Sequence, residues 1–314
     1  MKQDWETLWK NPWAQAGILL LLLIIYIWTR QVLVGVLIAL LIFFIVALEI
    51  RQGAKERGWR HEAIDTLKAL AIALVLWFGV GWVLNTSAPL SAVASCSMLP
   101  NLDRGDFVVV QGAPLQAPEI TLTAEEFQAL QGEAVIHYRT QEQSVRGSIF
   151  SYCRVFNDDV CNEWRNRPEE VLESRGPLTF HYTTCRIEQT GENTACVESL
   201  DYDGRNYPIR SSNDILVYAP GSGDYFARIG DIVHRTYIIL NVEGDRYYLT
   251  KGDNNPLLDI QIFDYFLNEG NAPVAEGQTK GKVIARIPWL GYFKLFIAGL
   301  FVEDSQCSQQ LVYP

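Results

Sequence analysis

Three long apolar segments lie near the start of the chain. They cover residues 14–29, 32–50 and 67–84, and charged residues stand only at their edges. Each approaches the roughly 20 residues that a helix needs to cross a bilayer. Buried helices of a water-soluble protein are the alternative, but these segments have no polar face to turn toward water. We therefore predict about three transmembrane helices in a membrane anchor over 1–86.

Basic residues between the second and third segments set the expected orientation. They are Arg51, Lys55, Arg57, Arg60 and Lys68. Because positive charge beside a span favours the cytoplasmic side, three spans place the bulk of the chain outside. The short Arg30-Gln31 connection then makes the first two spans an antiparallel hairpin, with Arg30 at the outer face. The mixed charge before the first segment argues against a cleavable signal peptide. We expect a multi-pass protein of the cell membrane.

Short runs of β-branched and aromatic residues fill the polar part of the chain, from about 87 to 287. Gly, Asn, Asp and Pro separate them, as is typical of strands. The clearest runs are 107–111, 134–138, 178–185, 215–218, 231–240, 247–251 and 282–287. Only 123–130 and 163–173 suggest short helices. We expect a mostly-β region whose sheets close on themselves.

The charge of the chain narrows the classes of partner. The 314 residues carry a formal net charge of −10, and the acidic residues are spread rather than grouped. Such a balance provides no basic surface for nucleic acid and mainly favours solubility. Nucleic-acid binding is therefore excluded from the expected functions.

Four cysteines of the polar region lack the Cys-x-x-Cys spacing of a metal site. They are Cys153, Cys161, Cys185 and Cys196. In an oxidising compartment two disulfides are the simplest interpretation, and four cysteines allow three pairings. Free buried thiols are the main alternative, and a zinc site is a remoter one. In this scheme Cys307 stays unpaired.

A serine motif follows the third apolar segment directly. It reads Ser95-Cys96-Ser97-Met98-Leu99-Pro100, and Gly105-Asp106 and the strand-like run 107–111 come after it. The pattern resembles the nucleophile loop of type I signal peptidases, serine proteases that cut leader peptides from exported proteins. A hydroxyl is a poor nucleophile until a base takes its proton. The resemblance therefore calls for a base elsewhere in the chain.

Of the four histidines, His234 has the most suitable setting. His61 lies in the predicted cytoplasmic segment, whereas His137 and His181 lie in strand-like runs where a hydrogen-bonded structural role is the simpler interpretation. His234 stands in Ile-Val-His-Arg, and Lys-Gly-Asp-Asn-Asn follows at 251–255. These segments resemble the corresponding boxes of the archaeal and endoplasmic-reticulum type of signal peptidase.

The resemblance implies a role for each matched residue. Ser97 would attack the scissile carbonyl, with His234 as general base and then as acid. Asp259 would orient the imidazole, and Asp253 is the competing orienter, although a turn-capping carboxylate is its structural alternative. The backbone N–H of Ser97 and the Ser95 hydroxyl would hold the oxyanion. The reaction needs no metal or organic cofactor.

The resemblance also implies the partners. The substrate would be the signal peptide of a preprotein, bound as an extended strand, with small residues such as alanine before the cut. Membrane lipid would surround the anchor. Protein translocation machinery or accessory subunits are further possible partners.

The chain departs from the family pattern in several places. Cys96 replaces the usual glycine between the serines, and Ile260-Gln261 stands where a basic residue is expected after Asp259. The stretch 111–212 is far longer than the family's connection, so we expect an inserted extracytoplasmic subdomain there. Its boundary is open, because 132–135 and 213–216 are both candidates for the next core strand.

The expected domain order follows from these matches. The catalytic β core covers 87–110 and 213–288, and it ends in a Pro-aromatic-Gly turn at 288–291 that is similar to the family's closing strand. A membrane-proximal segment, 289–314, comes last. Within it, 290–302 is short for a span and contains Lys294, which predicts a helix lying on the membrane surface.

Two other functions remain open at this point. The chain is alternatively a catalytically inactive signal-peptidase-like membrane subunit that serves as a binding or assembly module, although such a role does not require Ser97, His234 and an aspartate together. A bacterial-type Ser-Lys protease would need Lys251 as its base, and Lys251 falls outside the motif that normally supplies that lysine.

Overall fold

Three long helices form the N-terminal part of the computed structural model, which describes residues 11–303 and 305–314. They are α2 (Pro12–Thr29), α3 (Val32–Arg57) and α4 (Trp59–Val83). Each is long and apolar enough to cross a membrane. α4 buries none of its residues, and many large apolar side chains of all three are exposed. Because so much exposed apolar surface is unfavourable in water, the helices indicate association with a membrane.

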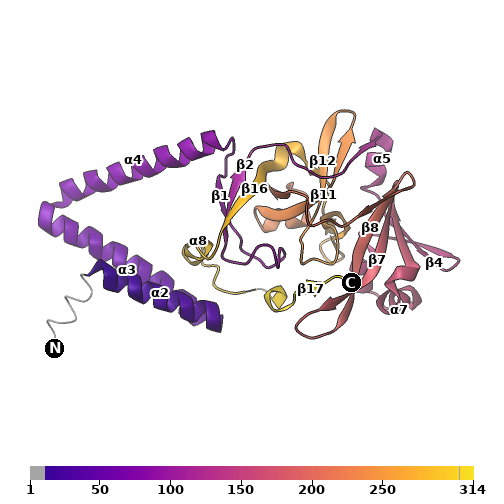
Figure 1. Cartoon of the computed structure of the whole chain (residues 1–314), viewed down its shortest axis with the longest axis horizontal. Coiled ribbons are helices and arrows are strands. Elements are labelled where there is room, and N and C mark those ends of the chain that lie inside the picture. Colours follow the sequence, from indigo (N-terminus) through magenta and orange to yellow (C-terminus); the bar gives the residue numbers. More distant parts are fainter. Residues whose placement is uncertain (1–10, 304) are drawn as a thin grey trace.

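The polar stretch between the second and third apolar segments is helical. α3 continues to Arg57, Gly58 ends it with a φ of 85°, and α4 begins at the next residue. Arg57 forms ion pairs with Glu62 at 3.1 Å and with Asp65 at 2.9 Å. α2 and α3 lie side by side, and α3 and α4 form a V that opens toward the β-rich body (Figure 1).

The first sheet has eight strands. Its path runs through β1 (Leu90–Ala92), β2 (Phe107–Gln111), β16 (Thr279–Ile287), β10 (Ile215–Tyr218), β11 (Ile232–Val242), β12 (Asp245–Lys251) and β15 (Val274–Ala275). Neighbours on this path are antiparallel, and β3 (Glu119–Leu122) adds to β11 in parallel. β1 and β15 do not pair with each other in the described chain, so the sheet stays open and does not close on itself.

The second sheet has seven strands and lies at the end of the body farthest from the long helices (Figure 1). Its path runs through β5 (Gln141–Val145), β4 (Ala134–Tyr138), β6 (Val171–Arg175), β7 (Leu178–Ile187), β8 (Asn193–Tyr202) and β9 (Arg205–Pro208), and β17 (Leu311–Val312) pairs with β7. A separate pair joins β13 (Phe263–Asp264) to β14 (Glu269–Gly270). The mostly-β expectation is therefore confirmed for this region.

The two sheets share their largest apolar core. Ile238 and Leu249 of the first sheet pack in the same cluster as Phe180 and Leu200 of the second. Most of the expected insertion, 111–212, therefore forms the second sheet, which packs against the rest of the body, whereas β3 of the same stretch adds to the first sheet. Of the two candidates for the next core strand, 213–216 leads into β10 beside β11, whereas 132–135 leads into β4 of the second sheet.

Short helices complete the body. They are α5 (Ala124–Ala129), α6 (Ile149–Cys153), α7 (Asp159–Asn166) and α8 (Gly291–Ile297), with 3-10 turns η1 (Pro168–Glu170), η2 (Tyr225–Arg228), η3 (Asp259–Gln261), η4 (Glu276–Gln278) and η5 (Ser305–Ser308). The predicted helix at 123–130 is confirmed, and a capping box of Thr123 and Glu126 starts it. The predicted helix at 163–173 is wrong in its second half, because Pro168 cannot continue a helix and β6 begins at Val171.

α8 joins the long helices to the β-rich body. Tyr292 and Phe296 on α8 both pack edge to face on Tyr26 of α2, with ring centroids 5.5 and 5.0 Å apart. Ile38 of α3 belongs to the same apolar cluster. The predicted surface helix over 290–302 is therefore shorter than expected, and one face of it is buried against the anchor.

All six cysteines form disulfides. The pairs are Cys153–Cys161, Cys185–Cys196 and Cys96–Cys307. The four cysteines of the insertion pair among themselves, as expected, in one of the three possible pairings. The expectation that Cys307 is unpaired is wrong. The C-terminal segment returns to the serine loop, the connection 93–106 between β1 and β2 that carries Ser97, across a sequence separation of 211 residues. The spacing of the cysteines alone does not indicate this pairing.

Candidate active site

Three polar side chains from distant parts of the chain meet in one hydrogen-bonded series. Ser97 Oγ lies 3.0 Å from His234 Nε2, and His234 Nδ1 lies 2.6 Å from Asp259 Oδ2. All three residues are buried, with exposed fractions of 8% for Ser97 and 3% for His234 and Asp259. This is the arrangement in which a carboxylate orients an imidazole and the imidazole accepts a proton from a hydroxyl.

Ser97 lies in the turn between β1 and β2. The next residue, Met98, is buried among apolar side chains that include Val108 and Val217, and this packing anchors the turn on the first sheet. The backbone N–H of Asn254 donates to the Ser97 carbonyl at 2.7 Å. Ser95 Oγ lies 3.2 Å from Ser97 Oγ.

His234 is held by the strand that carries it. It lies on β11, opposite Leu216 of β10, and most of β11 is buried on both faces. The ring of Phe226 meets the imidazole nearly edge to face, with centroids 6.1 Å apart. A buried strand and a packed aromatic ring leave the imidazole little freedom to turn away from Ser97.

Asp259 begins η3 and accepts three hydrogen bonds on one oxygen. Besides His234, Thr250 Oγ1 donates to Oδ2 at 2.6 Å and the Tyr218 hydroxyl donates at 3.1 Å. Burial, followed by the nearby Asp259 charge, raises the pKa of Tyr218 well above its usual value, so the phenol remains a neutral donor. Three donors on one oxygen fix the carboxylate beside the imidazole. The sequence did not single out Thr250 or Tyr218, because a strand pattern does not show which side chain faces a carboxylate.

Asp253 has a different position. Its two oxygens accept from Arg235 Nε and Nη2, both at 2.7 Å, and Asn101 Nδ2 donates to it at 2.7 Å. Asp253 makes no hydrogen bond or ion pair with His234. Of the two candidate orienters, the geometry therefore places Asp259 on the imidazole, and Asp253 ties β11 to the serine loop.

Lys251, the alternative base, points elsewhere. Its ammonium donates to the Gly252 carbonyl at 3.1 Å and lies 5.0 Å from the centre of the Tyr313 ring. Burial lowers the pKa of Lys251 to about 8. The amine lines a cavity of about 150 Å³ that does not include Ser97.

The other histidines of the body belong to the second sheet. His137 Nε2 lies 3.1 Å from Ser174 Oγ, and His181 Nε2 lies 2.7 Å from Asp201 Oδ2. Neither histidine lines the cavity that holds Ser97. Their contacts fit the structural roles expected for them.

A cleft of about 550 Å³ opens beside the three residues. Ser95, Ser97 and His234 line it together with a largely apolar wall that comes from residues 150–155, 225–232 and 256–266. The apolar members of this wall are Phe150, Val155, Tyr225, Phe226, Ile229, Ile232, Pro256, Leu257, Ile262, Phe263, Tyr265 and Phe266. Sequence reasoning missed this wall, because its residues are scattered over three segments with no common motif.

The site combines a buried Ser-His-Asp series with a cleft large enough for several peptide residues. Within the described residues, the backbone N–H of Ser97 donates no hydrogen bond. The chain's own geometry and sequence motifs define this candidate site. No protein-family model matches the chain, and no curated protein matches it.

Proposed function

We propose that the chain is a membrane-bound serine endopeptidase that removes N-terminal signal peptides from secreted or membrane preproteins. The observation that carries the proposal is the continuous hydrogen-bonded series Ser97–His234–Asp259 at the wall of a cleft, in a body attached to three apolar helices. The serine and histidine motifs of the sequence, which resemble those of signal peptidases, agree with this arrangement.

The proposed reaction begins at Ser97. As Oγ attacks the scissile carbonyl, His234 Nε2 accepts its proton and then delivers it to the leaving amine. The resulting acyl-enzyme is hydrolysed by a water that His234 activates in the same way. The Ser97 N–H and the Ser95 hydroxyl, 3.2 Å from the nucleophile, would hold the oxyanion, at about 3 kcal/mol for each donor.

Asp259 stabilises the imidazolium that forms during each step. Its Oδ2 accepts a hydrogen bond from the Nδ1–H of His234, and the bonds from Thr250 and Tyr218 keep this oxygen in place. Removing the negative charge would leave the imidazolium uncompensated in a buried site, which is costly. Asp259 is therefore required for proton transfer although it touches no substrate.

The anchor restricts the substrates that reach the cleft. A preprotein held in the same bilayer is presented at a high effective concentration, and its extended cleavage region can pair with the edge of a strand. We expect small residues, such as alanine, before the cut. The apolar wall of the cleft would then contact the neighbouring residues of the peptide.

The direct test is cleavage of a signal-peptide-bearing preprotein by the full chain in detergent or liposomes, with Ser97→Ala as the matched control. We expect the wild type to release the mature protein after a small residue, as shown by the new N-terminal sequence, and Ser97→Ala to release none. If both proteins are folded and neither cuts, the proposal fails in favour of the inactive binding subunit.

A further inference from the structure

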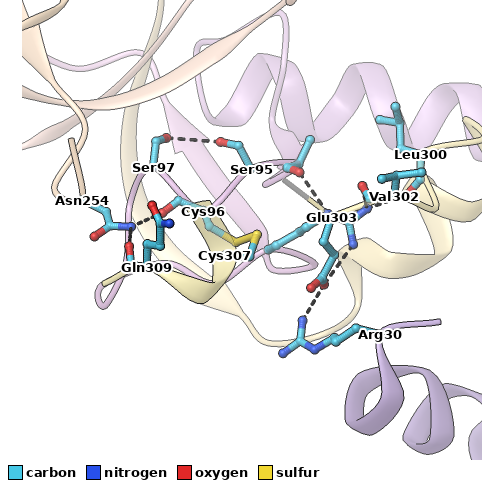
Figure 2. The surroundings of a disulfide bond; sticks show 12 residues. Arg30, Ser95, Cys96, Ser97, Asn254, Leu300, Val302, Glu303, Cys307 and Gln309 are labelled. Atoms are coloured by element: carbon cyan, nitrogen blue, oxygen red, sulfur yellow. Dashed lines mark hydrogen bonds and ion pairs between the residues drawn. A yellow bond between two sulfur atoms is a disulfide. The ribbon is translucent and has the colours of Figure 1, made fainter. Parts of the chain in front are cut away.

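A disulfide links the C-terminal tail to the residue directly before the proposed nucleophile. The tail, residues 300–303 and 307–312, passes beside the serine loop, and Cys307 pairs with Cys96 (Figure 2). Where Cys96 stands the resembled family has a glycine, so a flexible position is replaced here by a covalent anchor. The backbone on the N-terminal side of Ser97 is thereby fixed to a segment more than 200 residues away.

Asn254 connects the same two segments by hydrogen bonds. Its Nδ2 donates to the Cys96 carbonyl at 3.1 Å and to the Gln309 carbonyl at 2.9 Å, while its Oδ1 accepts from the Leu311 N–H at 2.7 Å. Its own backbone N–H donates to the Ser97 carbonyl at 2.7 Å. One buried residue, through its side chain and its backbone, thus joins the tail to the peptide groups on both sides of the nucleophile. The side-chain bonds to Cys96 and Gln309 are drawn in Figure 2.

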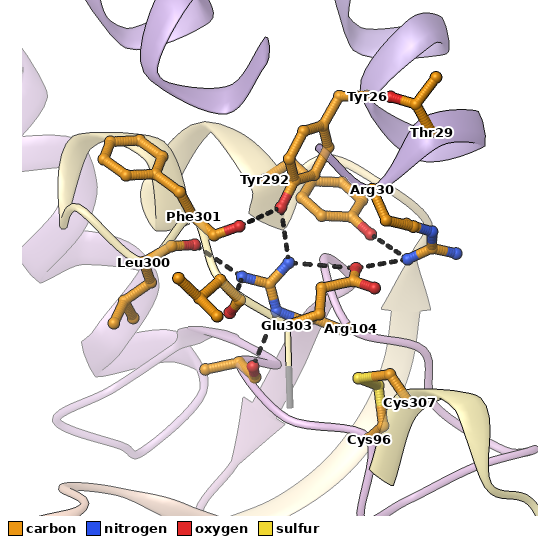
Figure 3. Close-up of polar contacts among 12 residues, drawn as sticks. Tyr26, Thr29, Arg30, Cys96, Arg104, Tyr292, Leu300, Phe301, Glu303 and Cys307 are labelled. Carbon is orange, nitrogen blue, oxygen red and sulfur yellow. Dashed lines mark hydrogen bonds and ion pairs between the residues drawn. A yellow bond between two sulfur atoms is a disulfide. The ribbon is translucent and has the colours of Figure 1, made fainter. Parts of the chain in front are cut away.

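The tail is itself held upstream of Cys307. The guanidinium of Arg104, whose side chain is 1% exposed, donates to the carbonyls of Leu300 and Val302 at 2.6 and 3.2 Å and pairs with Glu303 at 3.3 Å (Figure 3). Tyr26 of the anchor donates to the Phe301 carbonyl at 2.8 Å. This end of the tail is therefore attached to both the serine loop and the membrane helices.

The tail is also held downstream of Cys307. Leu311 and Val312 form β17, which pairs with Ile187 and Arg186 of β7 in the second sheet. Because both ends are attached independently of the disulfide, the tail is a firm support against which the serine loop is braced. A loop tethered only by its own turn would be more mobile.

We infer that the tail is a strap that positions the nucleophile, and that Cys307 and Asn254 are positioning residues acting on Ser97. This inference rests on the proposed function for its catalytic consequence. Misplacing a reacting group by about 1 Å can cost about a hundredfold in rate. A turn of the 96–97 peptide would move the Ser97 N–H as well as Oγ, so both attack and oxyanion binding depend on the strap.

The strap acts on turnover rather than on substrate binding. The residues that line the cleft include Asn255 but not Asn254, Cys96 or Cys307. Opening the strap therefore leaves the walls of the cleft in place, apart from Ser95 and Ser97 themselves. A loss of kcat with little change in KM is the expected signature of a group that matters only when the transition state forms.

The test compares three variants of the full chain in detergent. The variant Cys96→Ala/Cys307→Ala opens the strap without leaving a free thiol beside Ser97. Asn254→Ala removes the side-chain hydrogen bonds to Cys96, Gln309 and Leu311 while the disulfide stays closed, which keeps the test usable if the double variant folds poorly. The matched control, Cys153→Ala/Cys161→Ala, opens the disulfide between α6 and α7 instead.

Cleavage kinetics and amide hydrogen exchange together test the strap separately from the proposed function. We expect the first two variants to lower kcat for preprotein cleavage by about tenfold or more, with KM within about twofold of wild type. We also expect faster amide hydrogen exchange in residues 95–99 for these variants, but not for the control. Exchange at wild-type rates in both strap variants would overturn the inference. If the wild type cuts no preprotein, the proposed function fails, and hydrogen exchange alone still decides whether the strap holds the loop.

Discussion

At the scale of single residues, the site separates two aspartates that the sequence left as competitors. Asp253 stands within the Lys-Gly-Asp-Asn-Asn box and Asp259 follows it, and turn residues of this kind look alike in sequence. The two aspartates differ in their hydrogen-bond donors. Arg235 pairs with Asp253. The donors to Asp259 are His234, Thr250 and Tyr218. Their substitutions should therefore have different consequences.

Replacing each aspartate by asparagine tests this division. Asp259→Asn keeps the size of the side chain but removes the charge that stabilises the imidazolium, and we expect kcat to fall by about ten-thousandfold with little loss of stability. Asp253→Asn leaves Arg235 largely buried without its counter-charge, so we expect a lower midpoint of thermal unfolding and a much smaller loss of kcat. Preprotein cleavage and thermal unfolding measure the two effects. Equal losses of kcat would contradict the division of roles.

At the scale of elements, the strands with strong β-branched runs were predictable and the polar ones were not. All seven predicted strands occur, and 107–111, 134–138 and 215–218 match β2, β4 and β10. β5 (Gln141–Val145) escaped prediction because it is mostly polar and exposed, and β8 because small and polar residues break its pattern. These strands owe their conformation to pairing in the second sheet, which local sequence does not encode.

The site was predictable to a similar extent. Ser97 and His234 stand in motifs whose residue types indicate their chemistry, so the sequence was sufficient to nominate them. The donors to Asp259 and the apolar wall of the cleft arise from contacts between distant segments. The link from Cys307 to Cys96 also depends on the path of the tail across the fold.

Substituting a glycine of the serine loop tests how much the contact between α8 and this loop contributes to stability. Gly105 has a φ of 90°, and a Cβ there would lie 2.2 Å from the ring of Tyr292. Gly230 has a similar φ of 94° but open space around it. Both alanine variants carry a backbone strain of about 1 kcal/mol. Only Gly105→Ala adds overpacking, which costs about 1–3 kcal/mol more.

We therefore expect Gly105→Ala to lower the midpoint of thermal unfolding further than Gly230→Ala, and to increase hydrogen exchange in α8. Thermal unfolding in detergent and exchange mass spectrometry of residues 291–297 provide the measurements. If both variants lose the same stability, the packing of Tyr292 against Gly105 does not stabilise the contact between α8 and the serine loop.

At the scale of the whole molecule, both ends of the V formed by α3 and α4 face the β-rich body (Figure 1). Arg30, between α2 and α3, reaches Glu303 of the tail at 2.5 Å. α4 ends at Val83, shortly before β1. The corner at Gly58 lies at the opposite end of the helices. Three crossings would therefore place this corner and the body on opposite sides of a membrane, in agreement with the basic residues around the corner.

Labelling with a membrane-impermeant thiol reagent tests this orientation. Lys55 is exposed near the corner, and Arg205 is exposed in the second sheet. In intact cells we expect Arg205→Cys to react and Lys55→Cys to react only after the membrane is permeabilised. All native cysteines are in disulfides in both variants, so only the introduced thiol reacts with the reagent. If Lys55→Cys reacts in intact cells and Arg205→Cys does not, the chain has the opposite orientation.

The central claim is that His234, rather than Lys251, activates Ser97. The most direct measurement compares preprotein cleavage by His234→Ala and Lys251→Ala, with hydrogen exchange showing that both are folded. His234 Nε2 lies 3.0 Å from the nucleophile, whereas the Lys251 amine lines a different cavity. We predict that His234→Ala abolishes turnover and that Lys251→Ala keeps substantial activity. Turnover retained by His234→Ala and lost by Lys251→Ala would contradict the account.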